Sequence, residues 1–280
     1  MLLTPRYDGP PVLSLAGPPG AIAIPAIRQQ RRLVDTLAGL TDEQWSHPSR
    51  CDGWTAHDVA VHLHSVHGFW AFSTAQGLKG EPTRFLATFD PVASPPQMVA
   101  AAAPTTPAEL VEQMRASTGV LEAQWSSLTD ADWIALAEAP PGHISVSALV
   151  HHALWDSWIH EHDILVPLGI TPPAEDDEVA ASLRYVAALT PAFALCAGAS
   201  GRGSFAIDAG HVQVVVEVDE TVRVRSGLAL PEADTVDTVL RGDPVEVLEQ
   251  LSFRAPWTFD VPADQAWMLG GLATTFDRQD

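Results

Sequence analysis

Residues 150–163 read VHHALWDSWIHEHD, and this run contains neither proline nor glycine. It lies inside a helix that the sequence predicts from about Ser145 to Val166, with Ser145 or Ser147 as its cap and Gly169 just past its end. Residues three or four positions apart share one face of a helix. One face of this helix therefore carries Leu149, Ala153, Asp156, His160 and Ile164.

The acid and the imidazole on that face, Asp156 and His160, lie within an apolar stripe. Burying an unpaired carboxylate beside a histidine is costly unless a partner holds both groups. A divalent metal can bind two such side chains one turn apart. The pair therefore indicates a metal site, provided that the chain supplies a third ligand.

A second helix, predicted over residues 56–75, supplies that candidate. Gly53 breaks the chain before it and Thr55 caps it. Its apolar stripe consists of Val59, Leu63, Val66 and Trp70. Because His62 falls within this stripe, three residues after Val59, it is the candidate third ligand.

Composition limits the class of protein. A length of 280 residues indicates one large domain or two smaller ones, and a hydrophobic content of 46% is ample for a core. The chain has 15 basic and 35 acidic residues, a formal charge of -20, which argues against nucleic acids and anionic membranes as partners. Two cysteines, Cys51 and Cys196, are too few for a disulfide scaffold and favour a cytoplasmic location.

Other helices complete a pattern of four helices running up and down. Residues 25–40 form the first, and a third begins at Thr106, which is followed by Pro107 and Glu109, and runs to about Ser127. Between them, the proline-rich residues 77–105 are predicted to be a long loop with a short helix near 97–102. Such loops often act as lids or binding loops, and facing helices of a bundle often build metal sites.

The pattern changes after Gly169. A further helix is expected over 175–197, followed by a meander of β-branched strands and a helix that begins at Asp243. The strands are predicted at residues 204–208, 212–218 and 222–225. Three segments result: an N-terminal extension (1–24), a helical bundle with the metal site (25–170), and a linking helix with an α+β C-terminal domain (171–280).

Two motifs resemble those of a known family. The pattern Cys-x-Gly-Trp-Thr-x-x-Asp-x-x-x-His over 51–62, followed by acid-x-x-x-His-x-x-Asp over 156–163, resembles the mycothiol-dependent maleylpyruvate isomerase family of DinB-like metalloenzymes. A weaker match is similar to the sterol-carrier-like domain of the same family, and it comprises Ala233-Asp234-Thr235, Gly242, Leu248, Leu251 and Arg254. The resemblance implies a DinB-like four-helix bundle with a smaller sterol-carrier-like α+β domain.

The resemblance also implies a catalytic metal, usually zinc, held by His62, Asp156 and His160. The family generally has glutamate where this chain has Asp156. With a side chain one methylene shorter, the helices approach more closely, a water intervenes, or the metal is bound less well. His152 is an alternative ligand, and Asp163 is expected to orient a ligand or to bond at the helix end.

Other residues have plainer expected roles. Surface or rim positions are predicted for His57, His64, His67, His151 and His162. Cys51 is expected to be a packing thiol. Core positions are predicted for Trp54, Trp70, Trp155 and Trp158. Arg254 is either an anchor for an anionic thiol cosubstrate or substrate, or an ordinary surface arginine.

Three protein ligands leave the fourth position of a tetrahedral zinc open. A thiol bound there has a lowered pKa and is poised to attack a small electrophile. We expect a metal-dependent thiol S-transferase that uses mycothiol, with a mycothiol-dependent cis-trans isomerase of the maleylpyruvate type as the alternative. Two other readings stay open: a non-catalytic ligand-binding relative with a vestigial site, and a structural role in which the histidines bind no metal.

Overall fold

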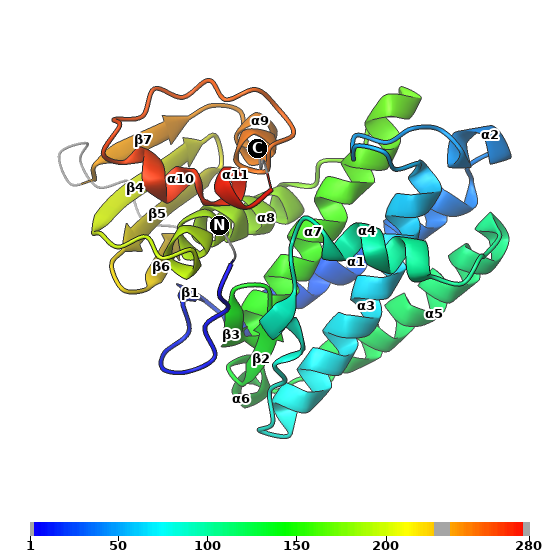
Figure 1. The fold of residues 1–280 in the computed structure, drawn as a ribbon, viewed down its shortest axis with the longest axis horizontal. Coiled ribbons are helices and arrows are strands. Elements are labelled where there is room, and N and C mark those ends of the chain that lie inside the picture. Colours follow the sequence, from blue (N-terminus) through cyan, green and yellow to red (C-terminus); the bar gives the residue numbers. More distant parts are fainter. Residues whose placement is uncertain (1–2, 227–235, 277–280) are drawn as a thin grey trace.

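The computed structural model describes residues 3–226 and 236–276. Its long helices form one half of the molecule (Figure 1). Four of the long helices lie side by side, and they are α1 (Ala23–Ala38), α3 (Ala56–Leu78), α5 (Pro107–Ser126) and α7 (Val146–Leu165). Helix α1 contacts α5 and α7, and α3 contacts the same two helices. This arrangement places α3 directly against α7, the two helices that carry the candidate ligands.

Side-chain caps start three of these helices where the sequence predicts them. Thr55 accepts a hydrogen bond from the backbone N–H of Asp58 at the start of α3, and Thr106 does the same for α5 through Glu109. Ser145 caps α7 by accepting from the N–H of Ala148. Each cap satisfies a backbone donor that a helix end leaves unpaired. The start of each helix, and with it the facing direction of its side chains, is thereby fixed locally.

The other half of the molecule is a mixed sheet with the strand order β1-β6-β5-β4-β7 (Figure 1). Its strands are β1 (Leu13–Leu15), β4 (Gly203–Ala209), β5 (Val212–Val218), β6 (Val222–Ser226) and β7 (Thr238–Arg241). Strands β4, β5 and β6 pair antiparallel, as expected for the predicted meander. The edge strands β1 and β7 pair in parallel with β6 and β4. The prediction of a mixed helical and sheet protein is confirmed.

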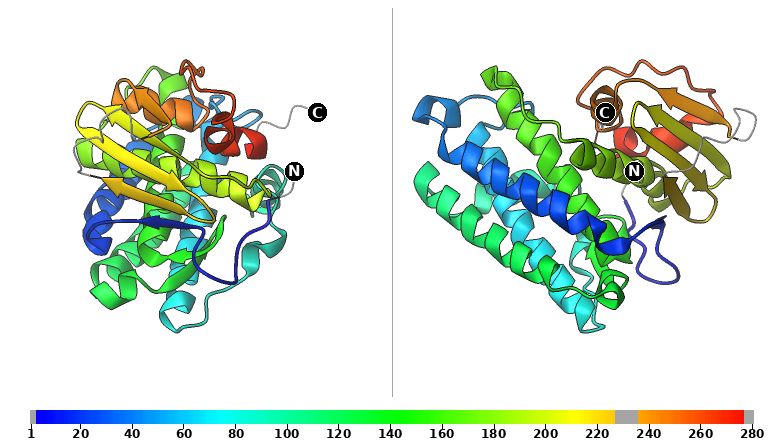
Figure 2. Two further views of the ribbon diagram at one scale, coloured as in Figure 1. Left: turned by 90° about the vertical axis from the view of Figure 1, so that its left-hand side faces the viewer. Right: turned by 180° about the vertical axis from the view of Figure 1, so that it is seen from behind.

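Helix α8 (Asp176–Cys196) lies between the two halves, as the view from behind also shows (Figure 2). It contacts α7 on one side and strands β1, β5 and β6 on the other. By length and composition α8 is the one helix of the described residues apolar enough to cross a membrane, but 83% of its apolar window is buried inside the protein. It serves here as the shared core helix of the two halves.

Three parts of the β structure are absent from the predictions: strand β1, the edge strand β7 and a hairpin. Residues 13–15, expected to belong to an extension, form the edge strand β1 of the C-terminal sheet. Residues 136–145 form a hairpin of β2 (Leu136–Ala139) and β3 (Gly142–Ser145), for which no strand was predicted. Gly142 has a φ of 113°, and a side chain there would collide with the backbone of Arg6. Only glycine permits this approach.

The long segment between α3 and α5 contains more structure than expected. It forms the 3-10 helix η2 (Phe85–Thr88) and the helix α4 (Ser94–Ala101), which begins three residues before the predicted 97–102. Helix α4 contacts α3, and η2 contacts β2. The buried carboxylate of Glu138 on β2 accepts the backbone N–H groups of Phe85 and Leu86, each at 2.8 Å. The segment is therefore fixed against the helical half.

Shorter helices complete the described chain: η1 (Pro19–Ile22), α2 (Asp42–Trp45), α6 (Asp130–Trp133), η3 (Val166–Leu168), α9 (Pro244–Leu251), α10 (Ala266–Leu269) and α11 (Gly271–Phe276). The helix predicted to start at Asp243 is α9, which Asp243 caps. Of the weak C-terminal motif, Ala233-Asp234-Thr235 lies outside the described residues, whereas Leu248 and Leu251 are buried on α9.

Candidate functional site

Helix α7 is buried along almost its whole surface, with two exceptions. Of its 20 residues, all but Asp156 and His160 are buried. The side chains of Asp156 and His160 are 15% and 13% exposed. The helix is otherwise buried on all sides, so its two partly exposed residues are an acid and an imidazole one turn apart. Such an arrangement indicates that these two groups have a role other than packing.

The structure brings His62 on α3 next to this pair. Ligand atoms of His62, Asp156 and His160 all lie within 4.8 Å of one another. The rings of His62 and His160 are 5.0 Å apart between centroids, and His160 Nε2 lies 3.7 Å from Asp156 Oδ1. The three side chains named from the sequence therefore converge from two facing helices.

The three side chains also suit a divalent metal. Asp156 Oδ2 is buried and has no hydrogen-bond partner among the described residues, a costly arrangement that a cation would relieve. Burial lowers the pKa of His62 to about 3, helped by the nearby His160, so its imidazole is neutral and its lone pair is free at neutral pH. Two imidazole nitrogens and one carboxylate oxygen form a donor set of catalytic zinc sites. We conclude that these residues fit the metal that the family resemblance implies.

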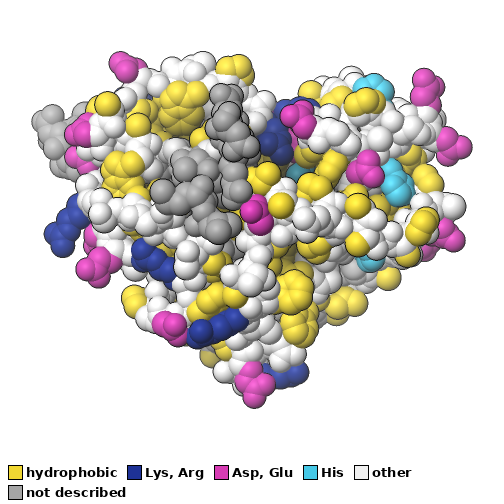
Figure 3. Space-filling view, viewed as in Figure 1, with side chains coloured by type: hydrophobic (Ala, Val, Ile, Leu, Met, Phe, Trp, Pro, Cys, Tyr) yellow, Lys and Arg dark blue, Asp and Glu magenta, His cyan; other side chains and the backbone are white. Residues whose placement is uncertain are grey.

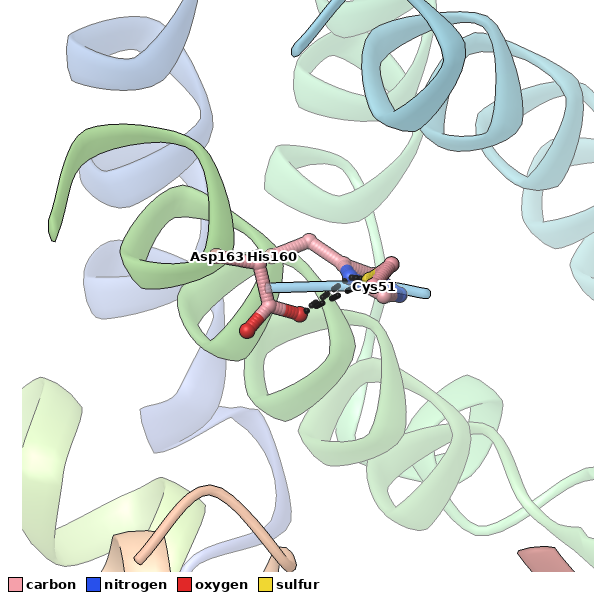
Figure 4. Close-up of side chains that lie close together, drawn as sticks. All are labelled: Cys51, His160 and Asp163. Atoms are coloured by element: carbon pink, nitrogen blue, oxygen red, sulfur yellow. Dashed lines mark hydrogen bonds and ion pairs between the residues drawn. The ribbon is translucent and has the colours of Figure 1, made fainter. Parts of the chain in front are cut away.

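Asp163 lies one turn further along α7 and fixes the orientation of the His160 ring through its Nδ1 atom (Figure 4). His160 Nδ1 donates to Asp163 Oδ2 at 2.9 Å, which directs Nε2 toward Asp156 and His62. The Cys51 thiol approaches from the loop before α3, 3.2 Å from the same carboxylate oxygen and 3.7 Å from His160 Nδ1. Asp163 therefore has the orienting position expected for it.

Charges around the site shift the pKa of each group. Burial alone would lower the pKa of His160, but the hydrogen bond to Asp163 and the proximity of Cys51 and Asp156 raise it to about 10. Burial raises the pKa of Asp156. Burial would also raise the pKa of Asp163, but its bonds to His160 and Arg254 hold it well below its usual range. Two carboxylates, those of Asp156 and Asp163, thus lie against His160, and this arrangement favours a proton or a metal ion there.

Two arginines neutralise Asp163. Arg254, which follows α9, donates through Nε to Oδ1 at 2.7 Å and through Nη2 to Oδ2 at 2.9 Å. Arg50 donates through Nε to Oδ1 at 3.0 Å and pairs with Glu249 on α9 at 3.1 Å. This network joins α7, the loop before α3, and the C-terminal half. Sequence reasoning named Arg254 but missed Arg50 and Glu249, although Arg50 immediately precedes the Cys51 motif.

The polar cluster forms one end of a cavity of about 380 Å³. Both halves of the molecule line it: α3, α4, η2 and α7 from the helical half, and Ser252, Phe253, Arg254 and Leu272 from the C-terminal half. On the face seen in Figure 3, hydrophobic side chains gather over α3 and α4. The segment 77–105, expected to be a binding loop, contributes much of the apolar wall.

Several residues lie elsewhere than predicted. His67, His151 and His162 are buried rather than on the surface, with 1%, 5% and 5% exposed, so the prediction of surface or rim positions is wrong for them. Their neighbours in other helices cover them, and burial lowers the pKa of both His67 and His151 to about 4. His57 and His64 are partly exposed.

Other predicted roles are mixed. Cys51 is half-buried and lines the cavity besides packing against the apolar core. Trp158 is a core residue, whereas Trp54, Trp70 and Trp155 also line the cavity. His152 lines the cavity too, but its Nδ1 lies 2.8 Å from the Tyr185 hydroxyl, and it is not part of the cluster of candidate ligands.

Two imidazoles and a carboxylate in the lining of a largely apolar cavity define a site for chemistry on a small molecule. Comparison with known proteins shows which family carries this site. Residues 27–165 match the family model of the mycothiol maleylpyruvate isomerase N-terminal domain. The chain belongs to this family, as its motifs indicated, and this membership identifies it as an enzyme.

Two solved structures share the fold. One is the crystal structure of the mycothiol-dependent maleylpyruvate isomerase, which is 14% identical, with a TM-score of 0.58 over 85% of this chain and 90% of that chain. The other is a histidine-to-alanine variant of that isomerase, 16% identical, with the same TM-score and coverage. At these identities the likeness shows the fold. No curated protein sequence matches the chain.

Proposed function

We propose that this enzyme is a thiol-dependent cis-trans isomerase that holds a divalent metal, zinc by preference, at His62, Asp156 and His160, with mycothiol as its thiol. One observation carries the proposal: the three side chains converge at the polar end of an apolar cavity, within 4.8 Å of one another. The family membership supports the isomerase reaction and the thiol, and it favours isomerisation over the S-transfer that the sequence first suggested.

His62, Asp156 and His160 would hold the zinc ion, and the bound ion would supply a lowered pKa to a thiol at its open coordination position, so that a thiolate would be available at neutral pH. The protein residues do the rest. Asp163 holds His160 in the tautomer whose Nε2 faces Asp156 and His62. The apolar walls exclude water, which would compete for the electrophile. Arg254 stands beside the cluster with N–H groups available to an anionic part of the thiol.

The reaction has a simple electron balance. The thiolate sulfur bonds to one carbon of the conjugated cis double bond, and the π electrons move to the carbonyl oxygen. The former double bond is now single and rotates. Collapse of the enolate restores the double bond in the trans form and expels the thiolate, so no atom is gained or lost.

S-transfer is the second candidate, because the same addition leaves a stable thioether when the enolate takes up a proton from water in place of elimination. The apolar wall favours it in one respect, since aromatic side chains such as Phe85 and Phe89 would retain the apolar part of an adduct. The mass of the product separates the two reactions. An isomer has the mass of the substrate, and a transfer product is heavier by one thiol.

The assignment of the two halves of the molecule to known domain types is also a proposal. We infer that residues 25–170 form a DinB-like four-helix bundle that carries the site, and that residues 171–280 form a sterol-carrier-like α+β domain. Ser252 and Arg254 line the cavity, which supports a role for this second domain in closing the site. The cytoplasmic location expected from the free thiols Cys51 and Cys196 is part of the proposal.

The test is thiol-dependent turnover of a cis-enone with mycothiol, glutathione or no thiol, in the parent protein and in His62→Ala, His160→Ala and His64→Ala variants. His64 shares α3 with His62, but its Nδ1 lies 3.5 Å from Ser117 Oγ, and it does not line the cavity. Turnover should require thiol and fall at least about 100-fold in the first two variants, since even outer partners of metal ligands account for about 10- to 100-fold. Turnover without thiol, or full activity in His62→Ala, would contradict the proposal.

A further inference from the structure

The cavity has two unlike ends. Its polar end is made of the candidate ligands with Cys51 and Arg254. Apart from Asp52, His152 and Ser252, the rest of the lining is apolar, and much of it consists of aromatic rings, among them Phe69, Trp70, Phe85, Phe89, Trp155 and Phe193. Such a lining stabilises the part of a ligand that loses contact with water there, and it penalises any charge placed there without a partner.

Charged side chains are scarce in the lining, and carboxylates there outnumber arginines and lysines. Among the described residues that line the cavity, Arg254 is the one arginine or lysine, and Asp52 and Asp156 are carboxylates. Arg254 already donates twice to Asp163, at 2.7 Å and 2.9 Å. Its remaining N–H groups suffice for one further anionic group at the polar end. A second carboxylate would lie against aromatic rings, in a protein whose formal charge is -20.

The apolar end is formed by a segment that is built into the fold. Phe85 and Leu86 are fixed by the buried Glu138, which accepts their backbone N–H groups, and α4 packs against α3. Helix α4 contributes Met98, which is 39% exposed and also lines the cavity. The wall is therefore a defined surface for the non-reacting part of a substrate.

We infer that the substrate is an uncharged, apolar α,β-unsaturated carbonyl compound, whose conjugated end lies at His62, Asp156 and His160 and whose apolar substituent lies against residues 85–98. The inference rests on the proposed function and narrows it, because maleylpyruvate carries two carboxylates and the apolar wall at residues 85–98 offers the second one no arginine or lysine. A volume of about 380 Å³ lies within the range of small-molecule sites, about 300–1,000 Å³.

The kinetic test compares cis-benzylideneacetone with maleylpyruvate, both with mycothiol. We expect kcat/KM to favour the apolar enone at least about tenfold, the scale on which pocket contacts discriminate between substrates. Equal values, or a preference for maleylpyruvate, would overturn the inference while leaving the proposed function in place. Turnover of neither compound would count against the proposed function, and binding then decides the question of substrate class.

Binding is measured without turnover by quenching of tryptophan fluorescence, since Trp54, Trp70 and Trp155 line the cavity. The probes are the saturated ketone benzylacetone and the dicarboxylate adipate. Benzylacetone should bind and adipate should not. Stronger binding of adipate, or binding of neither, would overturn the inference.

A charge placed at the apolar end tests the orientation of the ligand. Met98→Lys should weaken the binding of benzylacetone about tenfold and strengthen the binding of adipate. The matched control is Val120→Lys, an exposed apolar position on α5 that does not line the cavity and is 56% exposed. Val120→Lys should leave both affinities unchanged. An equal response of the two variants, or no response to Met98→Lys, would contradict the placement of the apolar substituent.

Discussion

Asp163→Asn tests the carboxylate on which the site is assembled. The Asp163 side chain is 0% exposed, yet it accepts hydrogen bonds from Arg50, Arg254 and His160 at 2.7–3.0 Å. Asparagine keeps the size but removes the negative charge, and its amide turns two N–H donors toward cationic groups. Removing one partner of a buried ion pair costs about 3–5 kcal/mol. Because the side chains of Arg50 and Arg254 are 18% and 25% exposed, water screens them in part, and we expect the lower end, about 3 kcal/mol.

The assay is urea denaturation followed by tryptophan fluorescence, beside an Asp177→Asn control. Asp177 also pairs with an arginine, Arg28, but its side chain is 54% exposed, so its loss should cost about 0–1 kcal/mol. Asp163→Asn should also weaken zinc binding about 10- to 100-fold, since the tautomer of His160 is no longer fixed. A loss of stability equal to that of the control, with unchanged zinc affinity, would refute the reasoning.

Three further predictions concern stability. Burial lowers the pKa of His67 from 6.5 to about 4, so its contribution to the free energy of unfolding is complete above pH 6.5 and is lost as the pH falls toward 4. Between pH 7 and pH 5 the free energy of unfolding in urea should fall by about 2 kcal/mol more in the parent than in His67→Gln. Equal losses in the two proteins would contradict this. Glu138→Gln should cost about 1–3 kcal/mol, because the buried carboxylate accepts the N–H groups of residues 85–86; an unchanged melting temperature would count against that role. Gly77→Ala places a Cβ 2.2 Å from a backbone oxygen of β2 and should destabilise the protein by at least about 1 kcal/mol, whereas Gly119→Ala, with open space around it, should stabilise by about 0.5–1 kcal/mol in the same unfolding experiment; the reverse order would contradict the packing of α3 on the hairpin.

The helices and the helix faces that carry the candidate ligands could be predicted from the sequence, because both depend on local signals. The caps Thr55, Thr106 and Ser145 fix where three helices begin. Helical periodicity then places His62 on α3, and Asp156 and His160 on one face of α7. The convergence of these residues also required that α3 and α7 face each other, and this contact is a finding of the tertiary structure.

The missed features depend on distant partners. Strand β1 exists because Leu13 pairs with Val222, more than 200 residues away, and three residues carry no period of their own. The hairpin needs Gly142 at a φ of 113° beside the backbone of Arg6, which no local pattern reveals. Likewise, Arg50 is a loop residue whose role appears only when α7 and α9 bring Asp163 and Glu249 beside it.

Burial of the histidines was mispredicted for a related reason. Surface or rim positions were predicted for His151 and His162, but α7 is the central helix of the molecule and is covered by α1, α3 and α8. His67 lies on α3, and the contact of α3 with α5 buries it in the same way. On α7, exposure rather than polarity identifies the site, since Asp156 and His160 are the two residues left open. That distinction requires the tertiary structure.

The central claim is that His62, Asp156 and His160 bind one metal ion. Elemental mass spectrometry tests it directly, on protein purified without a nickel column or chelator, beside His62→Ala, His160→Ala and the control His64→Ala. We predict about one zinc ion per chain in the parent and the control, and its loss in the other two variants while helicity is retained. No metal in the parent after addition of zinc, or full metal content in both ligand variants, would contradict the account.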